Sequence, residues 1–265
     1  MPREQIPTHT LGIDLASQPK ETAACLIEWL PTGGRVIDRP NDALTDDVLV
    51  DLILDERVSK VGIDAPFGWP VAFIDAIASY RDQGMWLDLE PNEIRFRATD
   101  IFVWDQTKRA PLSVAMDDLA WPAMRCARIL SRMAGEHGVL DRTGQGRVAE
   151  VYPMAALRRW EVISLDTPPQ EWSYKGHGPG RGERRAQHFA KLCELLDGSV
   201  AMSDEFAELC VADDDDFDAF VSALVARATE LSQTDTIPRG MHWQALREGW
   251  IQLPSPDSVG QLATT

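Results

Sequence analysis

Two short segments of this 265-residue chain decide its fold: L-G-I-D, residues 11–14, and V-G-I-D, residues 61–64. Each is an apolar run typical of a buried β-strand, closed by an aspartate and a turn signal. An unpaired charge at the end of a buried strand is unfavourable, and several carboxylates brought together raise each other's pKa values. Because a divalent cation removes both penalties, the pattern predicts a carboxylate metal site on a sheet, holding Mg²⁺ or Mn²⁺.

A helix predicted over residues 213–231 carries a run of aspartates at its beginning. Its apolar stripe, with a period of 3.6 residues, places Asp218 on a flank close to the core. Asp215 lies further round the helix. Asp213 and Asp216 are expected to be ordinary first-turn acids that complement the helix dipole, with Asp216 pointing to solvent.

Each candidate acid also has an ordinary structural interpretation. Asp14 and Asp64 could hydrogen-bond the backbone of the turn that follows each strand. Glu150, in the strand-like segment V-A-E-V-Y-P, could face either solvent or a cleft. The recurrence of G-I-D favours the functional interpretation, because neighbouring strand ends lie within ~5 Å of each other, close enough to share a cation.

The segment R-F-R-A-T-D places Arg97, Thr99 and Asp100 within four residues. One interpretation is a surface salt bridge, and the other is an arginine that holds a substrate phosphate. The sequence does not support a histidine metal site, a nucleophilic triad or a phosphate-binding loop. The five histidines show no metal-binding spacing, and neither a nucleophile motif nor a glycine-rich phosphate loop is present.

Composition narrows the possible partners. The net charge of −16 argues against a broad basic surface for duplex nucleic acid, although a small basic cleft remains compatible with it. Four scattered cysteines without C-x-x-C spacing indicate a reduced compartment and no structural zinc. The N-terminus lacks an apolar signal region and no run is long enough to span a bilayer, so we expect a cytoplasmic protein without membrane contact.

The order of elements predicts an α/β protein with one domain over residues 1–265. Three antiparallel strands come first, then a helix capped by Thr45 and the strand that ends at Asp64. An irregular, partly helical insertion at about residues 67–147 is expected to pack over one edge of the sheet. The remaining predicted elements are a helix at 122–134, a strand at 148–152, a helix opened by Pro153, a glycine-rich basic loop at 174–185 and a helix at 184–196.

Five segments in order resemble the family known as domain of unknown function 429, whose members are predicted RNase H-like nucleases. The resemblance runs from Gly12 to Pro254 and implies an RNase H-like fold, which is a mixed sheet with three antiparallel strands first and flanking helices. The segments are G-I-D-L-A-S at 12–17, G-I-D-A-P-F-G-W-P at 62–70, R-A-T-D at 97–100, E-V-Y-P at 150–153 and D-D-F-D-A-F-V-S-A at 215–223.

The resemblance also implies a mechanism. In similar nucleases, acids on the first strand, the fourth strand and the last helix bind two divalent ions that drive phosphodiester hydrolysis. Here these acids are Asp14, Asp64 and Asp218, with Glu150 as a further catalytic residue and Asp215 as a further ligand. Junction-resolving nucleases usually carry glutamate where this chain has Asp64.

Phosphate contacts in this interpretation come from Arg97 with its neighbours Thr99 and Asp100, and from the loop at 175–185. The acidic surface favours a small or single-stranded nucleic acid, or a nucleotide, as the partner. Two alternatives stay open. One is a nucleotide- or phosphate-binding enzyme of actin-like ancestry, although Leu-Ala-Ser follows Asp14 where glycines would be needed. The other is a non-catalytic binding module on the same fold, in which metal would neither bind tightly nor stabilise the protein.

Overall fold

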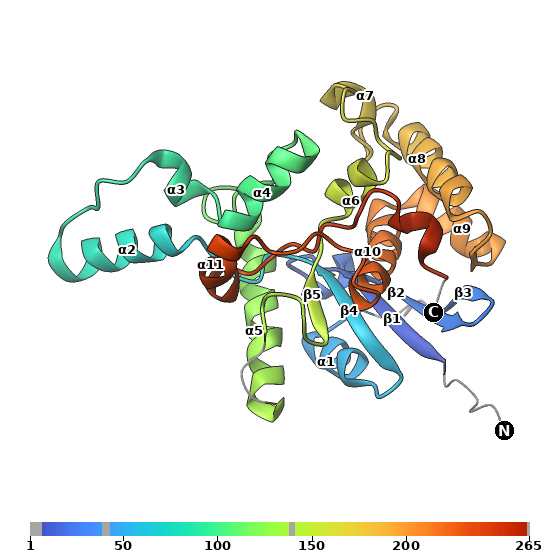
Figure 1. Cartoon of the computed structure of the whole chain (residues 1–265), viewed down its shortest axis with the longest axis horizontal. Helices are drawn as coiled ribbons and strands as arrows, with labels where there is room; N and C mark the ends of the chain where they lie inside the picture. Colours follow the sequence, from blue (N-terminus) through green and yellow to red (C-terminus); the bar gives the residue numbers. More distant parts are fainter. Residues whose placement is uncertain (1–6, 39–42, 138–140, 264–265) are drawn as a thin grey trace.

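A single mixed sheet organises the protein in a computed structural model that describes residues 7–38, 43–137 and 141–263 (Figure 1). The first three strands pair antiparallel, as predicted, while β4 lies parallel to β1, β5 parallel to β4 and β6 parallel to β3. The order across the sheet is β5-β4-β1-β2-β3-β6. The strands are β1 (Thr8–Asp14), β2 (Ala23–Leu30), β3 (Gly33–Asp38), β4 (Val58–Asp64), β5 (Val148–Glu150) and β6 (Val200–Ala201).

Two helices begin where the sequence predicts. The side chain of Thr45 accepts a hydrogen bond from the amide of Val48 at the start of α1, and Pro153 occupies the first turn of α6. The helices are α1 (Asp46–Leu54), α2 (Val71–Gln83), α3 (Pro91–Arg95), α4 (Ala98–Thr107), α5 (Ala120–His137), α6 (Pro153–Arg159), α7 (Pro169–Trp172), α8 (Arg181–Leu196), α9 (Asp204–Ala212), α10 (Asp214–Glu230) and α11 (His242–Glu248). Helix α8 starts three residues before the predicted position, directly after Gly180, whose φ is +71°.

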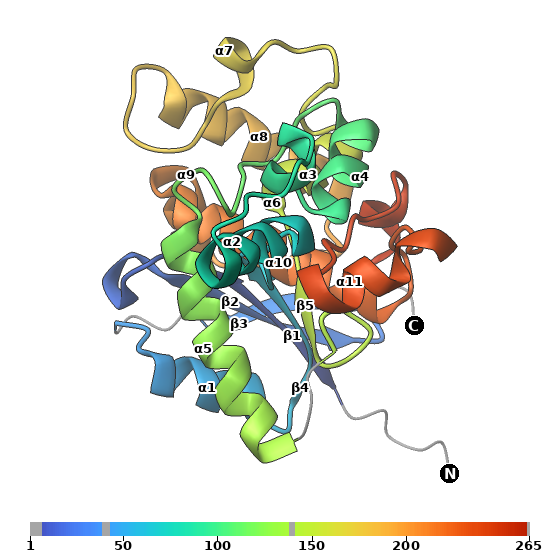
Figure 2. The ribbon, with the colours of Figure 1, turned by 90° about the vertical axis from the view of Figure 1, so that its left-hand side faces the viewer.

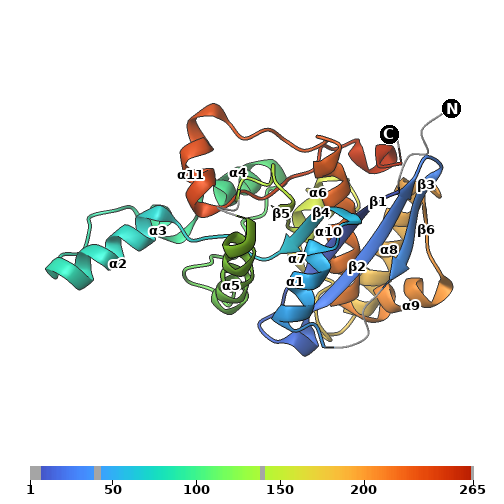
Figure 3. The same cartoon turned by 90° about the horizontal axis from the view of Figure 1, so that it is seen from below.

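Helices cover both faces of the sheet. Alternate side chains of β1 and β4, such as Ile13 and Ile63, pack in one apolar cluster with α1 and α5. Figure 2 shows these two helices side by side. The opposite face, represented by Ile27 of β2, packs in a second cluster with α6, α8, α9 and α10, and Figure 3 shows α8 and α9 close to β6. Successive strand residues therefore serve two separate cores.

Helix α10 lies directly on the backbone of β1 and β4 because each strand has glycine at the contact. A methyl group added at Gly12 would lie 2.0 Å from the carbonyl oxygen of Ala219 and 2.2 Å from the amide nitrogen of Ala223. One added at Gly62 would lie 2.5 Å from the carbonyl oxygen of Ser222. The glycines of the two G-I-D motifs thus set the distance between the sheet and α10.

The segment between β4 and β5 contains α2 to α5 and divides into two parts. Helix α5 packs against α1 through Cys126, Ile129 and Met133, so it covers a face of the sheet rather than an edge. Helices α2 and α3 extend away from the sheet, as Figures 1 and 3 show. Within the described part of the chain, no helix combines the length and the apolarity needed to cross a membrane.

Candidate active site

The two G-I-D motifs bring their aspartates to the same point. Asp14 and Asp64 are paired in register on the parallel strands β1 and β4. Because side chains alternate along a strand, both aspartates share the face of Gly12 and Gly62, which is the face that α10 covers. The strand ends therefore present two adjacent carboxylates beneath the beginning of α10.

Asp218 of α10 completes the group and is fully buried. The hydroxyl of Tyr174 donates a hydrogen bond of 2.6 Å to Asp218 Oδ1. The ammonium Nζ of Lys175 lies 2.5 Å from Asp218 Oδ2 and 3.7 Å from Asp64 Oδ2, and the lysine side chain is 43 % exposed. The Lys175 ammonium thus lies between carboxylates contributed by β4 and α10.

Burial and mutual repulsion control the charges of this group. Burial raises the pKa of Asp14 well above its usual value; Lys175 opposes the shift, and Asp64 and Asp218 add to it. Burial likewise raises the pKa of Asp64 to about 7 against the effect of Lys175. Burial alone would lower the pKa of Lys175, but Asp218 and Asp64 raise it well above its usual value. Lys175 therefore stays cationic while the aspartates resist full ionisation.

Asp215 lies beside this group, where burial and its neighbours Asp213 and Asp214 raise its pKa to about 6. Asp214 has a structural role: its carboxylate accepts hydrogen bonds from the amide of Gly176 at 3.0 Å and from Arg185 at 3.3 Å. It therefore ties the beginning of α10 to the segment that carries Lys175.

Asp213 and Asp216, the other two aspartates at the start of α10, lie in different surroundings. Asp213, predicted in the first turn of the helix, lies just before it as the N-cap of α10, where its side chain accepts a hydrogen bond from the amide of Asp215. The prediction that Asp216 points to solvent is wrong, because its exposure is only 3 %. Helix α9 packs against the beginning of α10 and covers it there, which the 3.6 period of α10 alone could not reveal.

The basic loop uses its arginines to hold its own shape. Arg185 donates a 3.0 Å hydrogen bond to the carbonyl of Tyr174, Arg181 donates to the carbonyl of Lys175, and Arg184 donates to a third carbonyl of the same segment. These contacts fix the two residues that meet Asp218. Within this loop, the structure thus brings Lys175 to the carboxylates and gives the three arginines a supporting role.

Glu150 lines one cavity together with Asp14 and Asp64, but it does not share their face of the sheet. It pairs in register with Ile63, so it points to the face opposite Asp64. It is buried, with 2 % exposure, and accepts hydrogen bonds from the amide of Phe67 and from Arg97, both at 3.0 Å. Burial raises the pKa of Glu150, and Arg97 opposes that shift.

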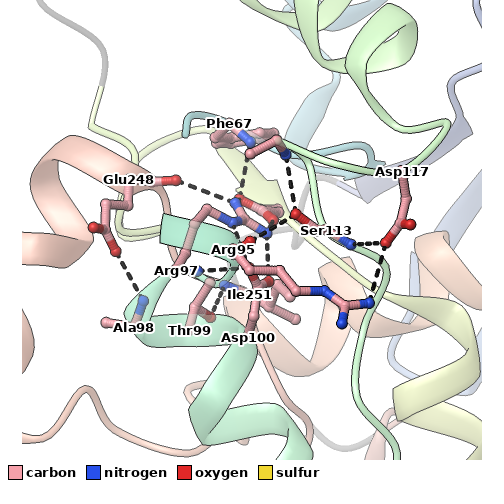
Figure 4. A network of polar contacts seen from close by, with 12 residues as sticks. Phe67, Arg95, Arg97, Ala98, Thr99, Asp100, Ser113, Asp117, Glu248 and Ile251 are labelled. Carbon is pink, nitrogen blue, oxygen red and sulfur yellow. Dashed lines mark hydrogen bonds and ion pairs between the residues drawn. The ribbon is translucent and has the colours of Figure 1, made fainter. Parts of the chain in front are cut away.

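Arg97 is the centre of a buried polar network rather than a free phosphate-binding group (Figure 4). Its guanidinium nitrogens all have partners: the carboxylates of Asp100 and Glu150 and the main-chain carbonyl of Glu248. Thr99 accepts a hydrogen bond from the amide of Ile251. The predicted substrate-binding set of Arg97, Thr99 and Asp100 therefore joins α4 to β5 and to the segment after α11.

A cavity of about 430 Å³ opens beside the carboxylates. Its walls combine charged groups with apolar and aromatic side chains. Leu112, Met154 and Trp172 among them lie outside the five sequence motifs. The lining residues include Asp14, Asp64, Asp215, Lys175, Arg109, Leu112, Tyr152, Met154 and Trp172. Among the described residues, no group of three or more His, Cys, Asp or Glu side chains is arranged to hold a metal ion. The carboxylates are grouped around the Lys175 ammonium instead.

These features define a mixed α/β protein with a carboxylate cluster where β1, β4 and α10 meet. Comparison with known families places it further: the chain belongs to the family described as "Protein of unknown function (DUF429)", whose model matches residues 12–242. The family predicted from the five motifs is thereby confirmed. Neither a curated protein nor a solved structure matches the chain.

Proposed function

We propose that this protein is an RNase H-like, divalent-metal-dependent hydrolase of nucleic-acid phosphodiester bonds, acting through Asp14, Asp64 and Asp218. One observation carries the proposal: three buried or half-buried carboxylates from β1, β4 and α10 converge beside a cavity. The strand order agrees with that fold, since an antiparallel meander is followed by a strand parallel to β1. Such a cluster costs stability unless a cation compensates it.

The donor set suits Mg²⁺ or Mn²⁺, because both prefer carboxylate oxygens and the raised pKa values of Asp14 and Asp64 indicate a deficit of positive charge. Asp14, Asp64 and Asp218 would hold the ion, with Asp215 beside them. Lys175 has to withdraw first, which its half-exposed side chain permits. A bound ion would activate a water molecule and stabilise the leaving oxygen.

The protein's own groups prepare this site. Tyr174 holds the Asp218 carboxylate in place through its 2.6 Å hydrogen bond. Asp214 anchors the backbone at Gly176, so a withdrawn Lys175 stays at the cavity. From there its ammonium can meet the negative charge of a substrate phosphate.

A second candidate function is a non-catalytic binding module. The observation that favours it is the 2.5 Å contact between Lys175 and Asp218, because an ammonium already neutralises part of the cluster without metal. The two candidates differ in their response to metal: a hydrolase exchanges the ammonium for an ion, and a binding module retains it.

Thermal unfolding with and without Mn²⁺ separates the candidates. For a hydrolase, Mn²⁺ at about 100 times its dissociation constant should stabilise the wild type by about 2.7 kcal/mol. Asp14→Asn should lose this response, and Lys175→Gln should bind Mn²⁺ more tightly because its competitor is gone. Lys191→Gln, which removes an exposed lysine paired with Glu194, is the matched control.

Cleavage of a short single-stranded oligonucleotide completes the test. It should require Mn²⁺ or Mg²⁺ and disappear in Asp14→Asn. If neither the wild type nor Lys175→Gln responds to metal, the hydrolase proposal fails and the binding module becomes the better explanation.

A further inference from the structure

The cavity beside the carboxylates contains an arginine that has no acidic partner in the part of the chain that the structure describes. Arg109 lines it, and within the described residues its guanidinium takes part in no hydrogen bond or ion pair. Its Nε is buried and unpartnered. The chain has 42 acidic and 26 basic residues, so acidic partners are abundant. A partly buried guanidinium left unpaired under these conditions is costly unless something else binds it.

The surroundings of Arg109 add to its unbalanced positive charge. Its Cζ lies 5.3 Å from the centre of the Trp172 ring, and the Cζ of Arg158 lies 5.7 Å from the same ring. Burial lowers the pKa of Arg158, and the charge of Arg109 lowers it further. Arg158 is fixed by hydrogen bonds to the carbonyls of Thr107 and Leu165. Among the described residues, Arg109 has the Trp172 ring contact but no such hydrogen bonds, so it can turn toward an anion.

We propose that Arg109 binds a phosphate group in this cavity, and that the ligand is a nucleotide or the phosphorylated end of a single strand rather than duplex. The identity of the anion rests on the proposed function, since a phosphodiesterase must recognise phosphate. The planar guanidinium matches phosphate through paired hydrogen bonds. The volume of about 430 Å³ is that of a small-molecule pocket, and Leu112, Tyr152 and Met154 provide walls for a base or sugar.

Phosphate binding without metal tests this role directly. Calorimetric titration with inorganic phosphate and with a nucleoside monophosphate should show binding to the wild type. Arg109→Gln should weaken it by about 10-fold to 100-fold, the effect of losing charge-assisted hydrogen bonds. The matched control is Arg247→Gln, because Arg247 also stacks on a tryptophan, at 4.1 Å from the Trp243 ring, but does not line the cavity. Equal binding by wild type and Arg109→Gln, or no binding up to about 10 mM ligand, overturns the proposal.

Thermal unfolding shows whether the Arg109→Gln variant is correctly folded. Because the guanidinium has no hydrogen bond to lose among the described residues, the variant should melt within a few degrees of the wild type. If Arg109→Gln does not fold, Arg109→Lys takes its place in the binding test. Lysine keeps the positive charge but lacks the planar guanidinium that can form two parallel hydrogen bonds to phosphate. Weaker phosphate binding by a folded lysine variant supports the proposal, and unchanged binding contradicts it.

Three ligands separate the possible sources of the phosphate: a mononucleotide, a short oligonucleotide with a terminal phosphate, and the same oligonucleotide without it. Binding of the mononucleotide alone identifies free nucleotides, whereas binding of both phosphorylated ligands identifies strand ends. Equal binding of both oligonucleotides contradicts recognition of a terminal phosphate. Because these titrations contain no metal, this inference can fail or succeed independently of metal-dependent cleavage.

Discussion

Asp64 shows how the site influences the stability of the whole protein. Its carboxylate lies in register with Asp14 and 3.7 Å from the Lys175 ammonium, and its pKa is raised to about 7 by burial, against the effect of Lys175. The folded state therefore binds a proton at Asp64 more tightly than the unfolded state, where the usual value is 3.8. By linkage, Asp64 lowers the free energy of unfolding as the pH rises from about 4 to 7.

Asp64→Asn removes this titration. We expect the variant to match the wild type near pH 4 and to be more stable than the wild type above pH 7, when metal is absent. Urea denaturation of both proteins across this range measures the difference. Asp51→Asn, which removes a carboxylate at an exposed position of α1, is the matched control for the loss of one aspartate. A wild type that gains stability relative to Asp64→Asn as the pH rises would contradict the raised pKa.

At the scale of elements, the contact of α10 with β1 and β4 builds the site. The sequence allowed prediction of both strands, of α10 to within one residue and of the acidic side chain that α10 contributes. It did not indicate why the motifs contain glycine, because that depends on which helix crosses the strands. Gly12 contacts Ala219 and Ala223, which lie more than 200 residues later in the chain. The spacing of residues in a sequence does not show which distant residues will be in contact.

Gly12→Ala tests this contact. The added methyl group would lie 2.0 Å from the Ala219 carbonyl oxygen, so α10 must move away from the sheet. We expect a loss of about 1–3 kcal/mol or more in the free energy of unfolding, together with weaker Mn²⁺ binding. Gly182→Ala, in α8 with open space around it, should instead stabilise by up to about 1 kcal/mol. Chemical denaturation compares the two, and an unperturbed Gly12→Ala would disprove the close packing.

At the scale of the molecule, the Arg97 network joins distant parts of the chain. It links α4 with β5 and with the carbonyl of Glu248 at the end of α11. The sequence identified Arg97 and Asp100 as a pair but not Glu150 as their partner. The same limitation applies to Lys175 and Arg109, because a single charged residue in a loop has no periodic pattern that reveals what it faces.

Arg97→Met would leave the buried carboxylates of Asp100 and Glu150 without their cation. Breaking a buried pair in this way typically costs about 3–5 kcal/mol, so we expect a large drop in melting temperature. Arg35→Met is the control: Arg35 pairs with Glu28, but its side chain is 59 % exposed, and its loss should cost about 1 kcal/mol or less. Similar melting temperatures for the two variants would show that the network contributes little.

The position of α10 over β1 also has a kinetic consequence. Asp14 and Asp218 are 204 positions apart (218 − 14), and β4 and the loop with Lys175 come from between them. Closing such long loops is entropically slow, whereas helices form within microseconds. A refolding chain should thus regain its helical signal first and its ability to bind ligand last, which makes ligand binding a marker of the final step of folding.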